Sequence, residues 1–500
     1  MELGTEIDTK IDSENSISNL PVDCFARILT FLIDDENTLF SAALVNRTWC
    51  RLAIPFLWNS FHFIRDDREG RCITETLIRC MNDEERNAII NSGLRLKKSY
   101  PQPLFLYTSF IKNFDLNKLK TVVSWYTHNS YKDYVARDNS IRQNTYDSNN
   151  INQIALQLLT QTYKLIFRTA ENLESFDVTT NILSYFMPNF TSSFHTPSVL
   201  AKLKKVKLSR NDVYDAYGKY EESEKNLENL RYLINALKLL SRNIRVLEID
   251  TNVLELNNIH QFCDLLEFQH NLKHLILKNI GDEHVSIIHA LHHQAKSLVY
   301  LEFRYSSLSI WTVTLLKKLG IFTRMEGIAF MECEWNSRHE NLFIDWWTEL
   351  SQFPTRLNKL YFDCTATIID KIMIPLIKIV GNNLKELRVR NDCTQQLIEV
   401  IAEHAKNISS LEIWLNLAAV AAPFLQTITS LQSLQLLILI NRFEPHDSLS
   451  DDFWIELSKT MNPDMKFYTN FILTPHALAS LLLNHIQPSN QYFRVLSWSF

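Results

Sequence analysis

Few residues in this 500-residue sequence have the types and spacing that catalysis or metal binding requires. Its 8 glycines are never clustered, whereas phosphate-binding loops need neighbouring glycines so that the backbone can approach the ligand. The adjacent His292 and His293 lie in a helix expected over 282–295, where consecutive side chains point about 100° apart and cannot both face one metal ion. Motifs of zinc proteases, serine hydrolases and catalytic-cysteine enzymes are missing. We therefore expect a protein that is not an enzyme and that has no cofactor and no metal.

The cysteines and the net charge indicate the cellular compartment of the protein and exclude some classes of partner. None of the 8 cysteines forms a C-x-x-C pair, which excludes an obvious zinc or redox motif and favours reduced thiols. The formal net charge of −5 offers no electrostatic basis for binding nucleic acid or an anionic membrane. The first residues are acidic and polar, unlike a signal peptide, and no apolar run is long enough to span a bilayer. These features predict a soluble protein of the cytoplasm, the nucleus or both.

The segment 19–58 predicts a compact module of three short helices. Its first apolar residues recur at helical spacing, at Phe25, Ile28, Leu29 and Leu32. The polar sequence DDEN (34–37) separates this run from a second helix, and Asn46 can cap a third helix that should end near Pro55. A unit of this size buries little surface and is marginally stable alone. We therefore expect it to pack against a partner.

This segment resembles an F-box. The resemblance rests on Leu20-Pro21, on ILTFL (28–32) and on LVNRTWCRLAIPFLW (44–58). Members of that family dock onto a Skp-type linker subunit, which joins them to a cullin scaffold and a RING ubiquitin ligase. The resemblance implies that the residues forming or supporting the linker-binding surface are Leu20, Pro21, Ile28, Leu29, Leu32, Val45 and Trp49. The alternative is a plain helical cap at the N-terminus of the chain.

A short repeated phrase dominates the rest of the sequence. Ten copies of L-x-x-L-x-L begin between residues 173 and 434, mostly 24 to 32 residues apart. Each alternates as a strand does and is followed by an amphipathic helix, so neighbouring units must stack to bury their apolar faces. The sequence predicts an α/β solenoid with parallel strands on the concave wall and helices on the convex wall. This part is similar to the leucine-rich-repeat family, which is known to occur together with the F-box.

The same pattern predicts the domain organisation. Residues 1–18 are expected to be a disordered acidic tail, and residues 19–65 the F-box of three short helices. A helical linker region follows over 66–165, with a polar loop near 134–153. The leucine-rich-repeat solenoid is expected to occupy residues 166–500.

Alternate residues of the predicted strands should line the concave wall, because the leucines point into the solenoid. Tyrosine, tryptophan and arginine are the residue types enriched at protein-binding hot spots. The predicted target-binding residues on this wall are Tyr300, Arg304, Tyr361, Arg388, Arg390 and Trp414. The apolar Leu436, Ile438 and Ile440 occupy the same face of the strand after these, so we expect later chain to cover that strand.

The F-box resemblance implies a substrate-recognition adaptor of a Skp–cullin–F-box ubiquitin ligase, with the repeats binding a target protein. Its partners would be the Skp-type linker, through it the cullin–RING ligase, and the target. One alternative is a repeat scaffold outside any ligase, in which the N-terminal helices only cap the array. Another is an enzyme with a site built from 66–165 and the array, which would require a deep pocket with clustered titratable groups. The sequence gives no support for such a pocket.

Overall fold

The computed structural model describes most of the chain and divides it into two compact units. The first comprises residues 1–177 and 188–199, the second residues 178–187 and 200–500. The described residues are 21–60, 66–96, 100–137, 148–181, 197–211, 224–253, 256–335, 356–364, 368–390, 393–414, 420–440, 449–469, 471, 473–485 and 494–495. The predicted acidic tail at 1–18 lies outside them.

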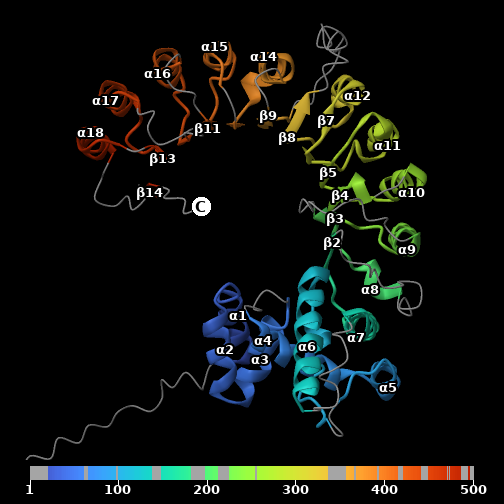
Figure 1. Cartoon of the computed structure of the whole chain (residues 1–500). Coiled ribbons are helices and arrows are strands. Elements are labelled where there is room, and N and C mark those ends of the chain that lie inside the picture. The colour runs from blue at the N-terminus through green and yellow to red at the C-terminus, as the bar shows by residue number, and fades with distance from the viewer. Residues whose placement is uncertain are drawn as a thin grey trace, which may run out of the picture. The chain divides into compact units, whose positions relative to one another are not determined.

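Three short helices open the first unit, as the periodicity predicts: α1 (Val22–Thr30), α2 (Glu36–Val45) and α3 (Arg47–Leu57) (Figure 1). Side-chain caps explain where two of them begin. The Asp35 carboxylate accepts the backbone N–H of Thr38 at 3.0 Å, and the Asn46 side chain accepts those of Thr48 and Trp49. Helix α3 continues through Pro55 and ends at Leu57, slightly beyond the predicted end, because a proline in the last turn removes few backbone hydrogen bonds.

Longer helices complete the first unit, with one short strand pair. They are α4 (Asp67–Cys80), α5 (Asp83–Asn91), α6 (Leu116–Arg137) and α7 (Ser148–Thr169), with the 3₁₀ turn η3 (Tyr107–Phe110). Strand β1 (Asn113–Asp115) pairs in parallel with β2 (Ser175–Asn181). The polar loop predicted near 134–153 falls on the end of α6, on the start of α7 and on residues 138–147, which are outside the described residues.

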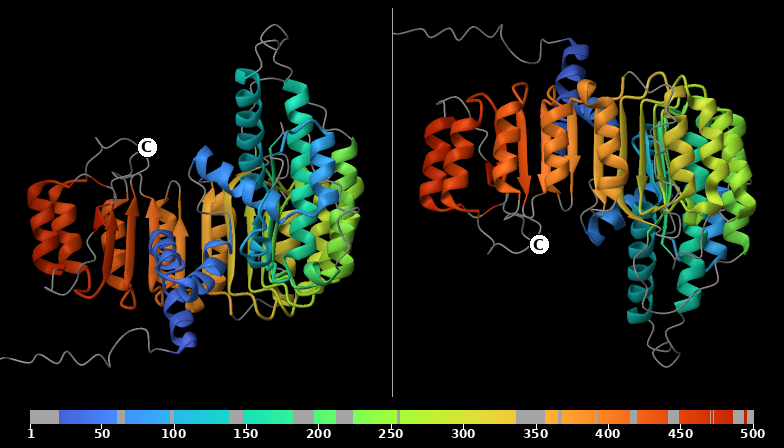
Figure 2. Two further views of the ribbon diagram at one scale, coloured as in Figure 1. Left: turned by 90° about the horizontal axis from the view of Figure 1, so that it is seen from below. Right: turned by 90° about the horizontal axis from the view of Figure 1, so that it is seen from above.

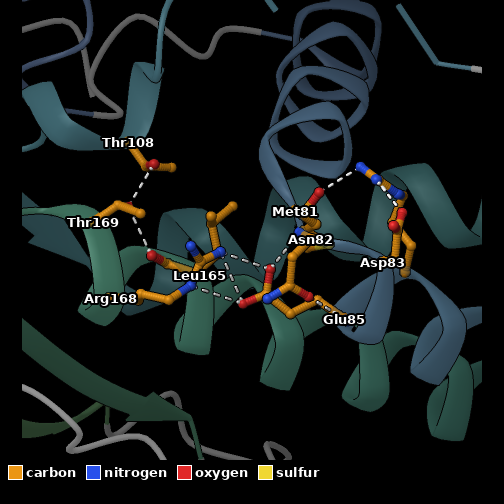
Figure 3. Close-up of polar contacts among 9 residues, drawn as sticks. Met81, Asn82, Asp83, Glu85, Thr108, Leu165, Arg168 and Thr169 are labelled. Atoms are coloured by element: carbon orange, nitrogen blue, oxygen red, sulfur yellow. Dashed lines mark hydrogen bonds and ion pairs between the residues drawn. The ribbon is translucent and has the colours of Figure 1, made fainter. Parts of the chain in front are cut away.

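A buried carboxylate joins α5 to α7. Glu85, only 6% exposed, accepts hydrogen bonds from the Arg168 guanidinium, with Nη2 3.0 Å from Oε2 (Figure 3). It also forms a capping box with Asn82, which begins α5. At the next residue of α7, Thr169 donates to the Leu165 carbonyl and lies 2.7 Å from the Thr108 hydroxyl of η3 (Figure 3). These contacts fix the positions of α5, α7 and η3 relative to one another.

Glu85→Ala should lower the free energy of unfolding by about 2 kcal/mol, because it removes both the capping box and the partner of Arg168. The cost is limited because Arg168 is 46% exposed and can be hydrated. Urea denaturation followed by circular dichroism measures it. The matched control is Asp83→Ala in the same helix turn, since Asp83 is 92% exposed and should contribute about 0.5 kcal/mol or less. Equal losses for the two variants would contradict this role of Glu85.

The second unit is a parallel sheet covered on one side by helices. Its strands follow one another in chain order: β3 (Lys205–Asn211), β4 (Val246–Asp250), β5 (His274–Lys278), β6 (Tyr300–Arg304), β8 (Gly327–Trp335), β9 (Lys359–Cys364), β10 (Glu386–Val389), β11 (Ser410–Trp414), β12 (Leu436–Ile440), β13 (Lys466–Thr469) and β14 (Arg494–Val495). The short β7 (Ser307–Leu308) pairs with the end of β8. Figure 1 shows the strands along the inner side of a curve and the helices along its outer side, and Figure 2 shows the strands side by side. The predicted α/β solenoid is confirmed.

The register of the sheet is set by the residue that precedes each strand. The carbonyl of Lys273, just before β5, accepts the N–H groups of Val299 (2.8 Å) and Tyr300 (2.9 Å) from the next repeat. The carbonyls of Glu326 and Asn358 accept two N–H groups from their following repeats in the same way. Equivalent positions of successive strands therefore form straight rows across the sheet, about 4.8 Å apart.

The outer layer contains α9 (Glu224–Leu240), α10 (Leu256–Glu267), α11 (Val285–Ala290), α12 (Ile310–Lys318), α14 (Ile374–Val380), α15 (Gln395–His404), α16 (Ala421–Ser430), α17 (Asp451–Thr460) and α18 (Pro475–His485); the shorter α8 (Pro197–Ala201) precedes β3. Two predicted helices differ in detail. The helix expected over 282–295 is broken into two 3₁₀ turns around α11, and α14 follows a π-helical turn (Ile369–Met373). Pro375 explains the second irregularity, because it has no N–H for an i→i−4 bond. In the described part of the chain, no helix is long and apolar enough to cross a membrane.

Candidate functional site

The N-terminal helices share one small core. Leu29 of α1, Leu39 and Ala42 of α2 and Ala53 of α3 are buried together. Trp49 packs on this core and meets the ring of Phe25 edge to face, with the centroids 5.0 Å apart. The module thus has a continuous interior despite its size.

The seven residues predicted to bind the linker have different environments. Leu29 is fully buried, and Leu32 and Trp49 pack beside it, so these three support the fold of the module. Pro21, Ile28 and Val45 are exposed. Leu20 lies outside the described residues.

Seven large apolar side chains of this module are exposed to solvent, by 44% to 81%: Val22, Ile28, Phe31, Ile33, Phe40, Leu44 and Val45. They come from α1, from α2 and from the turn between them, and we call them the α1–α2 apolar surface. Five of them escaped the sequence prediction, because helical periodicity selects the face that points inward. The available signal was the presence of Phe31, Phe40 and Leu44 at outward positions, where polar residues would be expected.

The concave wall of the solenoid forms a second candidate surface. In the row through the strand centres, Glu302, Ala329, Tyr361, Arg388 and Glu412 are successive partners in the register of the sheet. The neighbouring row runs through Tyr300, Gly327, Lys359 and Glu386. The wall therefore has small residues on β8 between larger side chains on both sides.

The same part of the wall has a hollow of about 220 Å³. Five of the six predicted target-binding residues line it, namely Tyr300, Arg304, Tyr361, Arg388 and Arg390. The Tyr300 and Tyr361 rings lie 6.0 Å apart on either side of β8, and a Cβ on Gly327 would come within 2.6 Å of the Tyr300 ring. Gly327 is thus required for the present position of Tyr300. The sixth residue, Trp414, lies beside this group, with the Arg390 guanidinium 5.8 Å from its ring centroid.

Glutamates beneath the arginines hold them in place. Glu412 is 4% exposed and accepts from Arg390 Nε at 2.8 Å, while Arg388 donates to Glu386 at 2.8 Å. Glu302, 6% exposed, pairs with Arg304 in the same way. The sequence pattern placed these glutamates on the wall but gave no sign that they anchor its arginines.

The tyrosines of the hollow are hydrogen-bond donors at all ordinary pH values. Burial raises the pKa of Tyr300 and of Tyr361 well above the usual range of a phenol. Burial alone would also raise the pKa of Glu386, but hydrogen bonds from Tyr361 and Arg388 outweigh it and lower that pKa. The Arg388 guanidinium stacks 4.8 Å from the Tyr361 ring centroid. A rigid set of aromatic rings and guanidinium groups therefore faces the solvent.

No group of three or more His, Cys, Asp or Glu side chains in the described residues could hold a metal ion. His292 and His293 lie in a 3₁₀ turn, and their ring centroids are 3.8 Å apart, closer than the helical geometry predicts. All eight cysteines are free thiols, four of them buried.

Comparison with known proteins bears on the N-terminal module. Residues 17–64 match the family model described as F-box-like. The chain carries an F-box-like domain. Behind this domain lies the solenoid of parallel strands and outer helices described above.

No curated protein matches the chain. Two solved structures are similar to it. One is the leucine-rich repeat-containing protein LegL7 from Legionella pneumophila, at 14% identity over 63% of this chain and 100% of that one, with a TM-score of 0.37. The other is a leucine-rich repeat protein from Leptospira interrogans, at 12% identity over 63% of this chain and 78% of that one, with a TM-score of 0.24.

Glu412→Ala should lower the free energy of unfolding by about 1–2 kcal/mol, because Arg390 and Arg388 lose a buried acceptor but can still be hydrated. The urea midpoint of the chain reports the loss. Glu334→Ala, an exposed position on β8, is the matched control and should change stability by about 0.5 kcal/mol or less. An unchanged midpoint for Glu412→Ala would show that the carboxylate does not anchor the wall.

Proposed function

We propose that this protein is the substrate-recognition adaptor of a Skp–cullin–F-box ubiquitin ligase. The F-box would dock onto a Skp-type linker and the repeats would bind a target protein, in the cytoplasm, the nucleus or both. The observation that supports this most is the exposure of the α1–α2 apolar surface within a module that matches the F-box-like family. In this role the chain performs no chemistry itself. It raises the local concentration of the target near the ubiquitin carrier of the ligase.

The energetics of the α1–α2 apolar surface favour a protein partner. Covering a large apolar side chain stabilises a complex by about 1.5–3 kcal/mol when burial is complete. Phe31 and Leu44 are 81% and 71% exposed, so most of that free energy is still available. Leu29 and Leu39 beneath them belong to the core of the module, which keeps the two helices in place before binding.

The scaffold alternative predicts a different environment for the residues of the α1–α2 apolar surface. A module that only capped the repeat array would bury its apolar face within the chain. Phe31, Phe40 and Leu44 are exposed within the first unit, and binding of a Skp-type linker to them would distinguish the adaptor from the cap.

The concave wall is the part of the repeats that we propose binds the target. Its arginines and tyrosines are already ordered by Glu302, Glu386 and Glu412, so little side-chain entropy would be lost on binding. The hollow beside the Tyr300 and Tyr361 rings can receive one side chain of the target. Arg and Tyr in such a setting are typical hot-spot residues.

The F-box assignment is tested by co-purification with a Skp-type linker. The intact chain should retain the linker, and the double variant Phe31→Asp/Leu44→Asp should lose it, because carboxylates would have to be desolvated in the interface. Thr48→Asp is the matched control, since Thr48 is exposed at the start of α3, where an acidic residue is tolerated. If the double variant is folded by circular dichroism and still retains the linker, the α1–α2 apolar surface is not the docking site. If the intact folded chain does not retain it, the scaffold alternative is favoured.

Target binding is tested with the linker complex as bait. Proteins captured by the intact chain should be reduced about tenfold or more with Tyr361→Ala/Trp414→Ala, because two aromatic contacts of the wall are lost. Quantitative mass spectrometry measures the capture, and linker content confirms that the variant is folded. The control is Tyr232→Phe/Phe268→Leu on the helix side, at two exposed positions. Unchanged capture by the concave variant would show that the target binds elsewhere.

A further inference from the structure

The strands of the solenoid have a cationic edge that the concave wall does not explain. In the three residues before each strand from β3 to β12, the middle one is buried and apolar, and the outer two face the solvent. These outer positions contain one acidic residue, Glu326, and seven basic residues, namely Lys202, Lys204, Arg245, Lys273, Arg324, Arg356 and Lys385. We call this set the N-terminal edge. It is strongly basic in a chain whose formal net charge is −5.

The cations of this edge differ from those of the concave wall in their partners. On the wall, Arg304, Arg388 and Arg390 each have a glutamate partner. On the N-terminal edge, no ion pair to any described residue is formed by Arg245, Lys273, Arg324, Arg356 and Lys385. Because all five are exposed, their charge is available to an external anion.

Backbone geometry fixes the positions of these cations. The residue immediately before each strand is the one whose carbonyl accepts two N–H groups from the next repeat, which places Lys273, Glu326, Asn358 and Lys385 in one row. Neighbouring positions in this row are about 4.8 Å apart. Arg324 and Arg356 lie two residues before Glu326 and Asn358, so the cations occupy two neighbouring positions of the repeats along the same edge.

Two adjoining hollows lie along the same edge. One, of about 390 Å³, is lined by residues from Lys273 to Arg356, and the other, of about 500 Å³, by residues from Glu326 to Asn407. They share Glu326 and Arg356, so together they make one groove from β5 to β11. Four asparagines of the second hollow can donate to and accept from a peptide backbone: Asn358, Asn382, Asn383 and Asn407.

We propose that this groove binds an extended acidic segment of a protein partner, with its carboxylates on Lys273, Arg324, Arg356 and Lys385. The groove crosses six strands, or roughly 24 Å, which an extended peptide of about eight residues covers. The site is separate from the concave wall and from the F-box, and it does not depend on the ligase function. It would add a second point of attachment to a partner that the wall also holds.

The lining of the groove favours a polypeptide over a nucleic acid. Single-stranded nucleic acids are bound through aromatic side chains on which bases stack, and neither hollow has an aromatic side chain in its lining. Glu326, in the middle of the groove, repels any anion placed opposite it, so the acidic side chains of the segment are expected on either side of it, while its carboxylate can accept hydrogen bonds from peptide N–H groups.

Fluorescence anisotropy with the full chain tests the proposal. The probes are a labelled octaglutamate, an octaglutamine of the same length and an eight-nucleotide oligothymidylate. Octaglutamate should bind, more weakly as salt rises, and octaglutamine should not. The triple variant Arg324→Gln/Arg356→Gln/Lys385→Gln should weaken octaglutamate binding by about tenfold or more.

The matched control removes the same charge from exposed positions of three outer helices, as Arg231→Gln/Lys378→Gln/Lys459→Gln. It should change the Kd for octaglutamate by no more than about twofold. Equal losses for the two triple variants would overturn the site, because attraction would then follow net charge alone. Absence of octaglutamate binding at low salt would also overturn it, as would tighter binding of oligothymidylate that depends on the same three residues.

Discussion

The solenoid depends on the backbone carbonyl of the residue that precedes each strand. By accepting two N–H groups from the following repeat, it fixes both the register of the sheet and the position of the residue that bears it. The inner rows that form the concave wall and the row of residues before the strands are both consequences of this one backbone pattern. Side chains far apart in the sequence, such as Tyr300 and Tyr361, become neighbours because Gly327 and Ala329 pair in register with β6 and β9, before the register shift between Met331 and Cys333.

The charged side chains of the concave wall and those of the N-terminal edge are arranged differently. On the concave wall, buried glutamates bind the arginines that face the solvent, so the wall is rich in charged groups but nearly neutral. This arrangement suits recognition by shape and by hydrogen-bond geometry. At the N-terminal edge, Arg245, Lys273, Arg324, Arg356 and Lys385 are exposed and form no ion pair with a described residue, which suits attraction of an acidic segment before contact. If one partner bound both surfaces, the N-terminal edge would attract it and the concave wall would determine its specificity.

Much of this could be predicted from sequence, because the signals were periodic. The L-x-x-L-x-L phrase predicted the strands and the face of Tyr361 and Arg388, and the caps at Asp35 and Asn46 predicted where helices begin. What escaped prediction depends on contacts between repeats. The Tyr300 ring can lie against Tyr361 because Gly327 on the strand between them has no side chain, and the anchoring of Arg390 requires Glu412 from the neighbouring strand. On the F-box, periodicity identified the buried Leu29 but not the exposed Phe31 and Leu44, which are apolar without belonging to the core.

The small residues on β8 have a consequence for how the surface of the concave wall can change. Side chains of the inner rows do not take part in the backbone hydrogen bonds between strands. A Cβ on Gly327 would come within 2.6 Å of the Tyr300 ring, so any side chain at this position would displace that ring. One substitution on β8 therefore reshapes the concave wall while the backbone pairing of the repeats is retained.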